Sequence, residues 1–178
     1  MASTAPSTEV GTRRRARNLF SFPNPVNEVS ARLVAAGVLT MALATLVFDQ
    51  PWILAVMAYG FLARVATGPS LSPLGQLVTR VITPRVPFPD RPVAGPPKRF
   101  AQGMGLAMTS TAAVLALGFG ERAAADVIAG LVVMAAGLES IFGFCIGCQV
   151  FAILMRRGLI PDDVCASCND LSLRAGAP

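Results

Sequence analysis

Four long apolar segments constrain this chain more than any other feature. They cover residues 29–48, 51–67, 100–120 and 127–155, and each contains at most one charged residue. A helix needs about 17–25 apolar residues to cross a bilayer, and inside lipid a helix satisfies its own backbone hydrogen bonds. The sequence therefore predicts an all-α integral-membrane four-helix bundle, built as two helical hairpins. As one helix the fourth segment would be roughly 43 Å long at about 1.5 Å per residue, longer than a hydrocarbon core of about 30 Å. We therefore expect that helix to be tilted, or to bend at its Gly-rich part around Gly143 and Gly147.

The composition agrees with lipid as the surrounding solvent. Hydrophobic residues make up 53% of the chain and charged residues 14%, whereas soluble domains carry about 25% charged residues. The absence of histidine excludes imidazole acid–base catalysis and histidine-ligated metal sites. With one Trp and one Tyr, the chain offers no stacking platform for bases. We therefore expect no nucleic-acid partner, although basic residues outnumber acidic ones.

The chain divides into three parts. Residues 1–26 form a basic, Ser- and Pro-rich arm that we expect to be disordered, residues 27–157 hold the four spans, and residues 158–178 form a polar cytoplasmic tail. Prolines interrupt residues 68–99, but between them apolar residues recur at helical spacing over 74–82. That spacing predicts a short amphipathic cytoplasmic helix, and the alternative is a cytoplasmic loop with one or two helical turns.

The positions of the basic residues predict the orientation. With four spans and both termini on one side, every Lys and Arg except Arg122 falls on that side or at its interface. The opposite turns, Asp49-Gln50 and Glu121–Asp126, are net acidic. Because basic loops stay in the cytoplasm, both termini are expected there. Arg32 and Arg64 are expected to reach the interface by snorkelling.

All four cysteines lie in two Cys-x-x-Cys pairs. Cys145 and Cys148, the membrane pair, lie in the fourth apolar segment, and Cys165 and Cys168, the tail pair, follow it. On one continuous helix, counted from Arg156 at about 1.5 Å per residue, the membrane pair would lie roughly 12–16 Å deep. Apolar surroundings make thiols less reactive, so a functional pair needs a polar cavity or a partner that reaches it. In the reducing cytoplasm the tail pair favours redox or metal chemistry over a structural disulfide.

Four functions fit these thiols, and whether the chain is an enzyme stays open. The leading hypothesis is a cytoplasm-facing thiol–disulfide or sulfur relay, in which the tail pair exchanges with a soluble partner and supplies the membrane pair. A second is a non-catalytic zinc site made by all four cysteines, whose spacing matches zinc ribbons; zinc is the one cofactor indicated. A third is part of a transporter for a small sulfur species, which would require homo-oligomers. A fourth is a structural subunit or assembly factor. The membrane pair could also be two small residues in a tight interface, which Gly143-x-x-x-Gly147 favours.

Glu139 is the single charge in the fourth segment. Acids inside a membrane are costly, usually paired and often functional, so Glu139 is a candidate catalytic residue together with Cys145, Cys148, Cys165 and Cys168. A structural ion pair that fixes the bundle is the alternative. On one ideal helix Glu139 would lie about 180–240° around the axis from the membrane pair. The candidate partners are Arg32, Arg64, Arg99, Gln102 and Asn27.

Three separated motifs occur at the helix starts and around the membrane pair: FPNPVNE at Phe22–Glu28, GPPKRFAQ at Gly95–Gln102 and GFCIGC at Gly143–Cys148. In the first, Asn27 can cap a helix. Together the motifs resemble the bacterial integral-membrane family labelled domain of unknown function 4395, over about residues 20–157. The resemblance implies a multi-pass protein of the bacterial plasma membrane without an assigned activity. The family's association with thioredoxin-like and sulfurtransferase proteins implies a partner of that kind.

Overall fold

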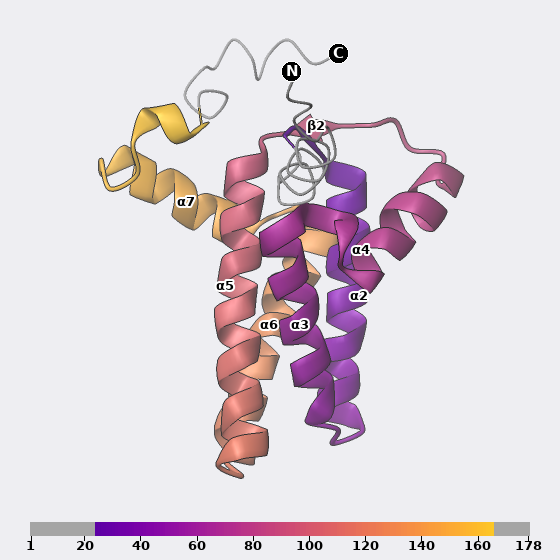
Figure 1. Cartoon of the computed structure of the whole chain (residues 1–178), viewed down its shortest axis with the longest axis vertical. Helices are drawn as coiled ribbons and strands as arrows, with labels where there is room; N and C mark the ends of the chain where they lie inside the picture. Colours follow the sequence, from indigo (N-terminus) through magenta and orange to yellow (C-terminus); the bar gives the residue numbers. More distant parts are fainter. Residues whose placement is uncertain (1–23, 166–178) are drawn as a thin grey trace, which may run out of the picture.

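The computed structural model describes residues 24–165, so most of the predicted arm and the end of the tail lie outside the described residues. Four long helices run side by side (Figure 1), and each begins a helical run long and apolar enough to cross a membrane. The predicted all-α bundle is thus confirmed. The four helices are α2 (Glu28–Val47), α3 (Trp52–Thr67), α5 (Gly95–Ala113) and α6 (Arg122–Phe142).

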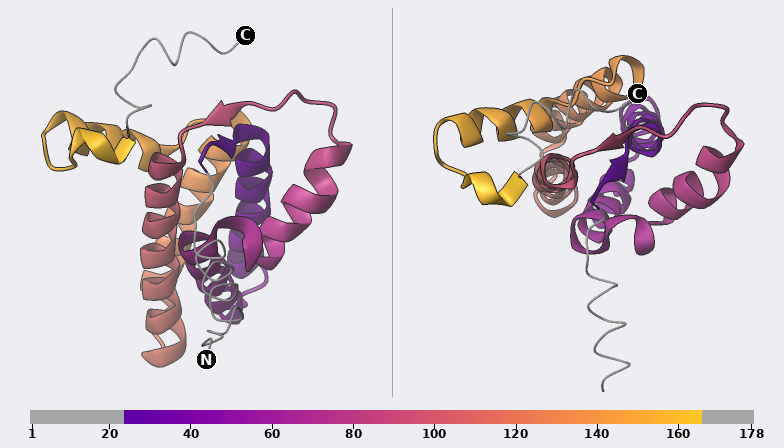
Figure 2. Two further views of the ribbon diagram at one scale, coloured as in Figure 1. Left: turned by 45° about the horizontal axis from the view of Figure 1, so that its top comes forward. Right: turned by 90° about the horizontal axis from the view of Figure 1, so that it is seen from above.

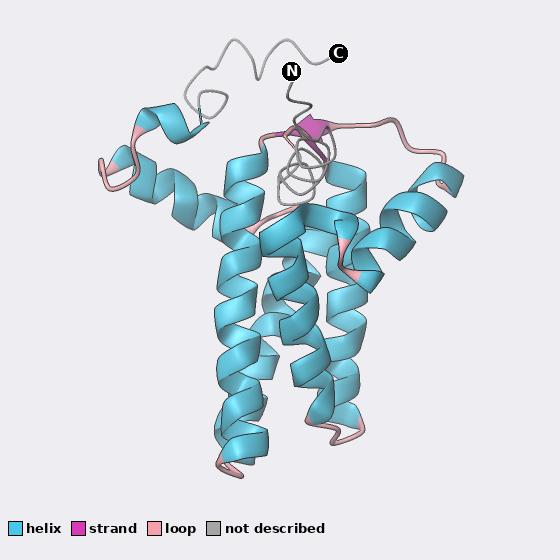
Figure 3. Ribbon diagram, in the orientation of Figure 1, coloured by secondary structure: helices cyan, strands magenta, loops and turns pink. Residues whose placement is uncertain are grey.

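Shorter elements complete the described chain (Figure 3). Helix α5 continues into one π-helical turn, and the chain between α3 and α5 is largely helical. In order, these elements are β1 (Val26–Asn27), η1 (Gly68–Ser70), α4 (Pro73–Leu77), η2 (Val78–Ile82), η3 (Thr83–Arg85), β2 (Pro92–Val93), η4 (Val114–Gly118), α7 (Ile146–Arg156) and η5 (Asp162–Cys165).

The turns of both hairpins lie at one end of the bundle, opposite β1 and β2 (Figure 1). Asp49 takes a φ of 51°, and the amide of Gln50 donates to the carbonyl of Thr45 at 3.2 Å, which ends α2. The next helix starts at Trp52, as the predicted turn at Asp49-Gln50-Pro51 requires. An ion pair between Arg122 and Asp49 joins the two hairpin turns.

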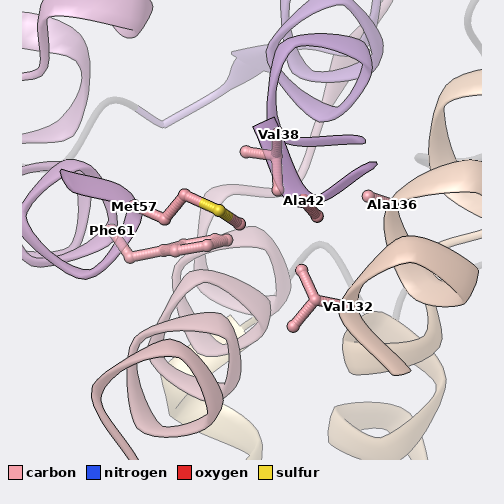
Figure 4. Close-up of a cluster of buried hydrophobic side chains, with 6 residues drawn as sticks. All are labelled: Val38, Ala42, Met57, Phe61, Val132 and Ala136. Atoms are coloured by element: carbon pink, nitrogen blue, oxygen red, sulfur yellow. The ribbon is translucent and has the colours of Figure 1, made fainter. Parts of the chain in front are cut away.

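The two hairpins interlock through their long helices. Helix α2 packs mainly against α6, and α3 mainly against α5. Side chains from three helices point toward one another in the middle of the bundle (Figure 4). Gly105 of α5 lies against the ring of Phe61, where any larger side chain would overlap it. The central cluster consists of Val38, Ala42, Met57, Phe61, Val132 and Ala136.

Large apolar side chains also cover the outside of the long helices. On a protein in water such a surface would be an aggregation hazard, whereas helices that are hydrophobic all round are typical of membrane spans. The apolar outer surface of the bundle is therefore consistent with four helices that are long and apolar enough to cross a membrane. Examples that are about half exposed or more are Trp52, Leu62, Val114, Leu131 and Met134.

The predicted short helix after the second span is confirmed. Helical turns run from Pro73 to Arg85, beginning at Ser72, whose hydroxyl accepts the amide of Gly75 at 3.2 Å. Seen from above, this segment leaves the bundle on one side and α7 leaves it on the other (Figure 2).

Of the two forms expected for the fourth segment, 127–155, the tilted continuous helix is wrong, and the chain instead changes direction at its Gly-rich part. Helix α6 ends at Phe142 because Gly143 adopts a φ of 69°, a left-handed conformation that glycine takes without steric cost. The amide of Phe144 then bonds to the carbonyl of Leu138 at 3.1 Å, and α7 begins at Ile146 in a new direction. The depth of 12–16 Å predicted for the membrane pair and its angle from Glu139 were both counted along one continuous helix, so both predictions are wrong.

Candidate functional site

The membrane pair lies at the start of α7 rather than inside a span. Cys145 has an extended backbone and occupies the N-cap position. Its Sγ accepts the backbone N–H of Cys148 at 3.4 Å. A helix N-terminus presents unpaired N–H groups and a partial positive charge, which favour an anion there. The break after Gly143 thus places Cys145 where a thiolate is stabilised.

Gly147, inside the Cys-x-x-Cys motif, brings α7 against α5. A Cβ added at Gly147 would lie 2.5 Å from the Cβ and 2.6 Å from the Cα of Ala101. Only glycine permits this approach of the two backbones, as Gly143-x-x-x-Gly147 suggested from the sequence. The contact places both thiols beside the first turns of α5, where Lys98 lies.

Lys98 forms a buried ion pair with Glu139. Lys98 Nζ and Glu139 Oε1 are 2.7 Å apart, and their side chains are 10% and 17% exposed. The sequence-based list of partners for Glu139 was therefore wrong, because it omitted Lys98. The signal was present, since Lys98 is the single lysine of a chain with fourteen arginines.

The residues proposed as partners for Glu139 have other roles. Arg32 caps the end of α6: its Nε donates to the carbonyl of Ser140 at 3.3 Å and its Nη2 to that of Ile141 at 2.6 Å. This side chain satisfies carbonyls that the break leaves without helical partners. Asn27 caps α2, its Oδ1 accepting the amide of Val29 at 2.9 Å, as predicted. Arg99 donates from Nε to the carbonyl of Val65 at 3.0 Å.

Arg64 and Gln102 bond to each other inside the bundle. Arg64 is 5% exposed, so the prediction that it snorkels to the interface is wrong. Its Nε donates to Gln102 Oε1 at 2.8 Å and its Nη1 to Ser72 Oγ at 3.2 Å, and its guanidinium lies 4.5 Å from the centre of the Phe61 ring. These neighbours hold the cation inside, where it interacts electrostatically with Glu139.

The two thiols of the membrane pair differ in acidity. A hydrogen bond from the Cys148 thiol lowers the pKa of Cys145, and the positive charge of Lys98 lowers it further, against burial and the charge of Glu139. The same hydrogen bond, with burial, raises the pKa of Cys148. Cys145 is therefore the more acidic thiol of the pair, and Cys148 is the thiol that keeps its proton to higher pH.

Cys145 also borders an apolar cavity of about 280 Å³ within the bundle. Helices α2, α3, α5 and α6 form its walls, and the first turn of α7 closes one end. Cys145, Glu139 and Gln102 are polar members of a lining that is otherwise largely apolar, with Met104 and Met134 among the latter. The thiol that geometry makes acidic is therefore next to a space inside the bundle.

The tail pair is only partly described. Cys165 is buried and packs with Phe151 and Met155 of α7, so the tail folds back on this helix. Phe151 lies about 9 Å along the helix from Cys145, at 1.5 Å per residue. Cys168 lies outside the described residues. Within residues 24–165, no group of three or more Cys, Asp and Glu side chains is arranged to hold a metal ion.

Comparison with known proteins adds a family but no activity. One family model matches residues 26–156, and its description is Domain of unknown function (DUF4395). A search of curated proteins and a search of solved structures found no match. The matched region contains both thiols of the membrane pair, Lys98 and Glu139.

Proposed function

Because the chain belongs to that family, whose description assigns no activity, we propose its function from the site: thiol–disulfide exchange by the membrane pair, at the cytoplasmic face of the bacterial plasma membrane. One observation carries the proposal. Cys145 caps α7 and accepts a hydrogen bond from the backbone of Cys148, with the Lys98–Glu139 ion pair among the charges that act on it.

The exchange proceeds in two steps. The Cys145 thiolate attacks a partner disulfide, forming a mixed disulfide and releasing one partner thiolate. Cys148 then attacks the Cys145 sulfur, its proton passes to the departing thiolate, and the membrane pair is left as a disulfide. Two electrons have moved from the membrane pair to the partner, which leaves as a dithiol. The reverse sequence reduces the membrane pair.

Lys98 and Glu139 act as positioning residues in this scheme. Lys98 provides the positive charge that favours the Cys145 thiolate, and Glu139 holds Lys98 in the buried site through the 2.7 Å ion pair. Removing Glu139 should therefore change the pH dependence of exchange through Lys98, without removing a reacting group.

The tail pair and a soluble partner complete the proposal. Cys165 packs on α7, so exchange between the two pairs requires the tail to move along this helix toward Cys145. A thioredoxin-like protein would exchange electrons with Cys165 and Cys168. With a sulfurtransferase-like partner, the Cys145 thiolate would instead take the outer sulfur of a persulfide, releasing the donor thiolate. The cytoplasmic orientation is supported by the distribution of basic residues.

Trapping of a mixed disulfide tests this function. In the Cys148→Ser variant the second step cannot occur, so reduced full-length protein in micelles, treated with glutathione disulfide, should accumulate a glutathione adduct on Cys145. Peptide mapping by mass spectrometry would locate it. The Cys145→Ser variant should form far less adduct at Cys148, whose pKa is raised. Cys165→Ser in the Cys148→Ser background is the control and should leave the Cys145 adduct unchanged. A Cys145 that stays unmodified while the protein remains folded would refute the proposal.

The other hypotheses have less support from the site. A zinc site would need all four cysteines, Cys168 included. Cys165 packs against Phe151 and Met155, which lie one to two helical turns beyond Cys148 along α7. Metal analysis of purified protein tests it, with about one zinc per chain expected. A transporter of a small sulfur species would be tested by flux into vesicles, and homo-oligomers or an assembly role by the mass of the purified complex.

A further inference from the structure

A second cavity, of about 210 Å³, lies between the start of α2 and the end of α3. This volume is several times the roughly 30 Å³ that one water molecule occupies in the liquid. Among the described residues, the charged ones that line it are Arg64 and Lys98, and both are basic. The uncharged polar residues of the lining are Asn27, Ser30, Thr79 and Gln102.

Arg64 has more N–H donors than residues 24–165 provide acceptors for it. A guanidinium carries five N–H donors, and its hydrogen-bond acceptors among residues 24–165 are Gln102 Oε1 and Ser72 Oγ. Neither acceptor is charged, and the ion pairs within these residues, Lys98–Glu139 and Arg122–Asp49, do not include Arg64. Burying a cation without a charged partner is costly. A ligand that accepts from the remaining N–H groups would reduce that cost.

Among the described residues, the buried charges around this cavity do not balance. Arg64 and Lys98 contribute two positive charges, and Glu139, the carboxylate paired with Lys98, contributes one negative charge. Glu139 lines the other cavity and is absent from the lining of this one. One positive charge is therefore in excess beside a space with room for a small ligand.

We propose that this cavity is a binding site for a small inorganic oxyanion of the size of sulfate. Planar guanidinium groups bind tetrahedral and planar oxyanions through paired N–H···O hydrogen bonds. Arg64 supplies the excess positive charge that attracts an anion, and Lys98 is the second cation of the lining. Gln102 lines both this cavity and the one that Cys145 borders, and it bonds to Arg64. Gln102 would therefore lie between the bound anion and the cavity beside Cys145. The site goes beyond thiol exchange, since neither sulfur lines the cavity.

Calorimetric titration tests the site with sodium sulfate as the probe. Full-length reduced protein in uncharged detergent and sulfate-free buffer should show saturable binding of one sulfate per chain. Arg64→Gln should weaken the affinity at least about tenfold, because hydrogen bonds to charged groups are the strong ones. Ala31→Met provides a second variant that keeps both cations, since Ala31 also lines the cavity and a larger side chain would occupy the space. It too should weaken binding.

Two controls separate this site from other effects. Arg122→Gln removes a cation at the opposite end of the bundle, paired with Asp49, and should bind sulfate like the unaltered protein. Cys145→Ser should also bind normally, so failure of thiol exchange would not be mistaken for failure of this proposal. Absence of saturable binding to the unaltered protein would overturn the proposal. So would a folded Ala31→Met variant that binds sulfate with unchanged affinity.

Discussion

Replacing Gly147 by alanine should loosen the contact between α7 and α5. The new Cβ would lie 2.5 Å from the Cβ and 2.6 Å from the Cα of Ala101, well inside van der Waals contact. Because the nearest atoms belong to backbone and Cβ, no side-chain rotation can relieve the overlap. The start of α7 must therefore move away from α5.

The expected cost follows from two opposing effects. Overpacking of a tight interface costs about 1–3 kcal/mol, whereas alanine gains up to about 1 kcal/mol over glycine in a helix. Since the overlap involves backbone, we expect Gly147→Ala to lower the free energy of unfolding by about 1–2 kcal/mol. Gly130→Ala is the matched control, because no heavy atom lies within 4 Å of a Cβ built at this helical position. It should be neutral or stabilising by up to about 1 kcal/mol.

Unfolding of both variants in mixed micelles with increasing SDS measures these differences. The same samples should show slower alkylation of Cys145 in Gly147→Ala, because the displaced helix start moves this thiol away from Lys98. Gly130→Ala should alkylate at the unaltered rate. If Gly147→Ala is as stable as Gly130→Ala and its thiol reacts equally fast, the close contact of α7 with α5 does not position the site.

Two further perturbations test the surroundings of the thiols. Lys98→Met should lower the free energy of unfolding by about 3–5 kcal/mol, as expected when a buried ion pair loses one partner. In a double-mutant cycle, adding Glu139→Gln should recover part of that loss. Additive effects of the two mutations would show that the pair is not coupled. Gly143→Ala should cost about 1–2 kcal/mol of backbone strain at its φ of 69°, and more because its Cβ would lie 3.2 Å from Glu28 Oε1. Gly120→Ala is the control, because Gly120 has a φ of 74° and open space around it, so this mutation introduces backbone strain without a new contact. If both mutations lower the free energy of unfolding equally in the same assay, the contact with Glu28 is unimportant.

The bundle was predictable because its determinants are local. Uncharged stretches of spanning length, the turn at Asp49-Gln50-Pro51 and the cap at Asn27 each act within a few residues. The helical spacing over 74–82 has the same character, and a helix is present there. These features need no knowledge of what packs against them.

For the fourth segment the sequence indicated a tilt or a bend at the glycines, but the complete end of α6 at Phe142 was not predictable in the same way. The run 127–155 is apolar throughout apart from Glu139, and glycine inside an apolar helix is common in membrane spans. The helix ends there because Arg32, more than one hundred residues earlier, caps the carbonyls of Ser140 and Ile141, and because α7 finds a surface on α5. Missing this one helix end also misplaced both thiols of the membrane pair.

The partner of Glu139 was missed for a related reason. Pairing across helices depends on which faces meet, and the Lys98–Glu139 pair joins α5 to α6, two helices whose facing residues the sequence alone does not identify. Arg64 shows the converse case, since its position in the last turn of α3 suggested an interfacial cation. Acceptors from Gln102 and Ser72 hold it inside instead.

The pH dependence of Cys145 alkylation tests the central claim most directly. Reduced full-length protein is treated with iodoacetamide over a range of pH, and peptide mapping gives the rate at each cysteine. The rate follows the thiolate fraction, and the pKa of Cys145 is lowered while that of Cys148 is raised. Alkylation of Cys145 should therefore reach half its maximum at a lower pH than that of free cysteine or of Cys148, and Lys98→Met should move this midpoint upward. A midpoint at or above that of free cysteine in the same micelles would contradict the account.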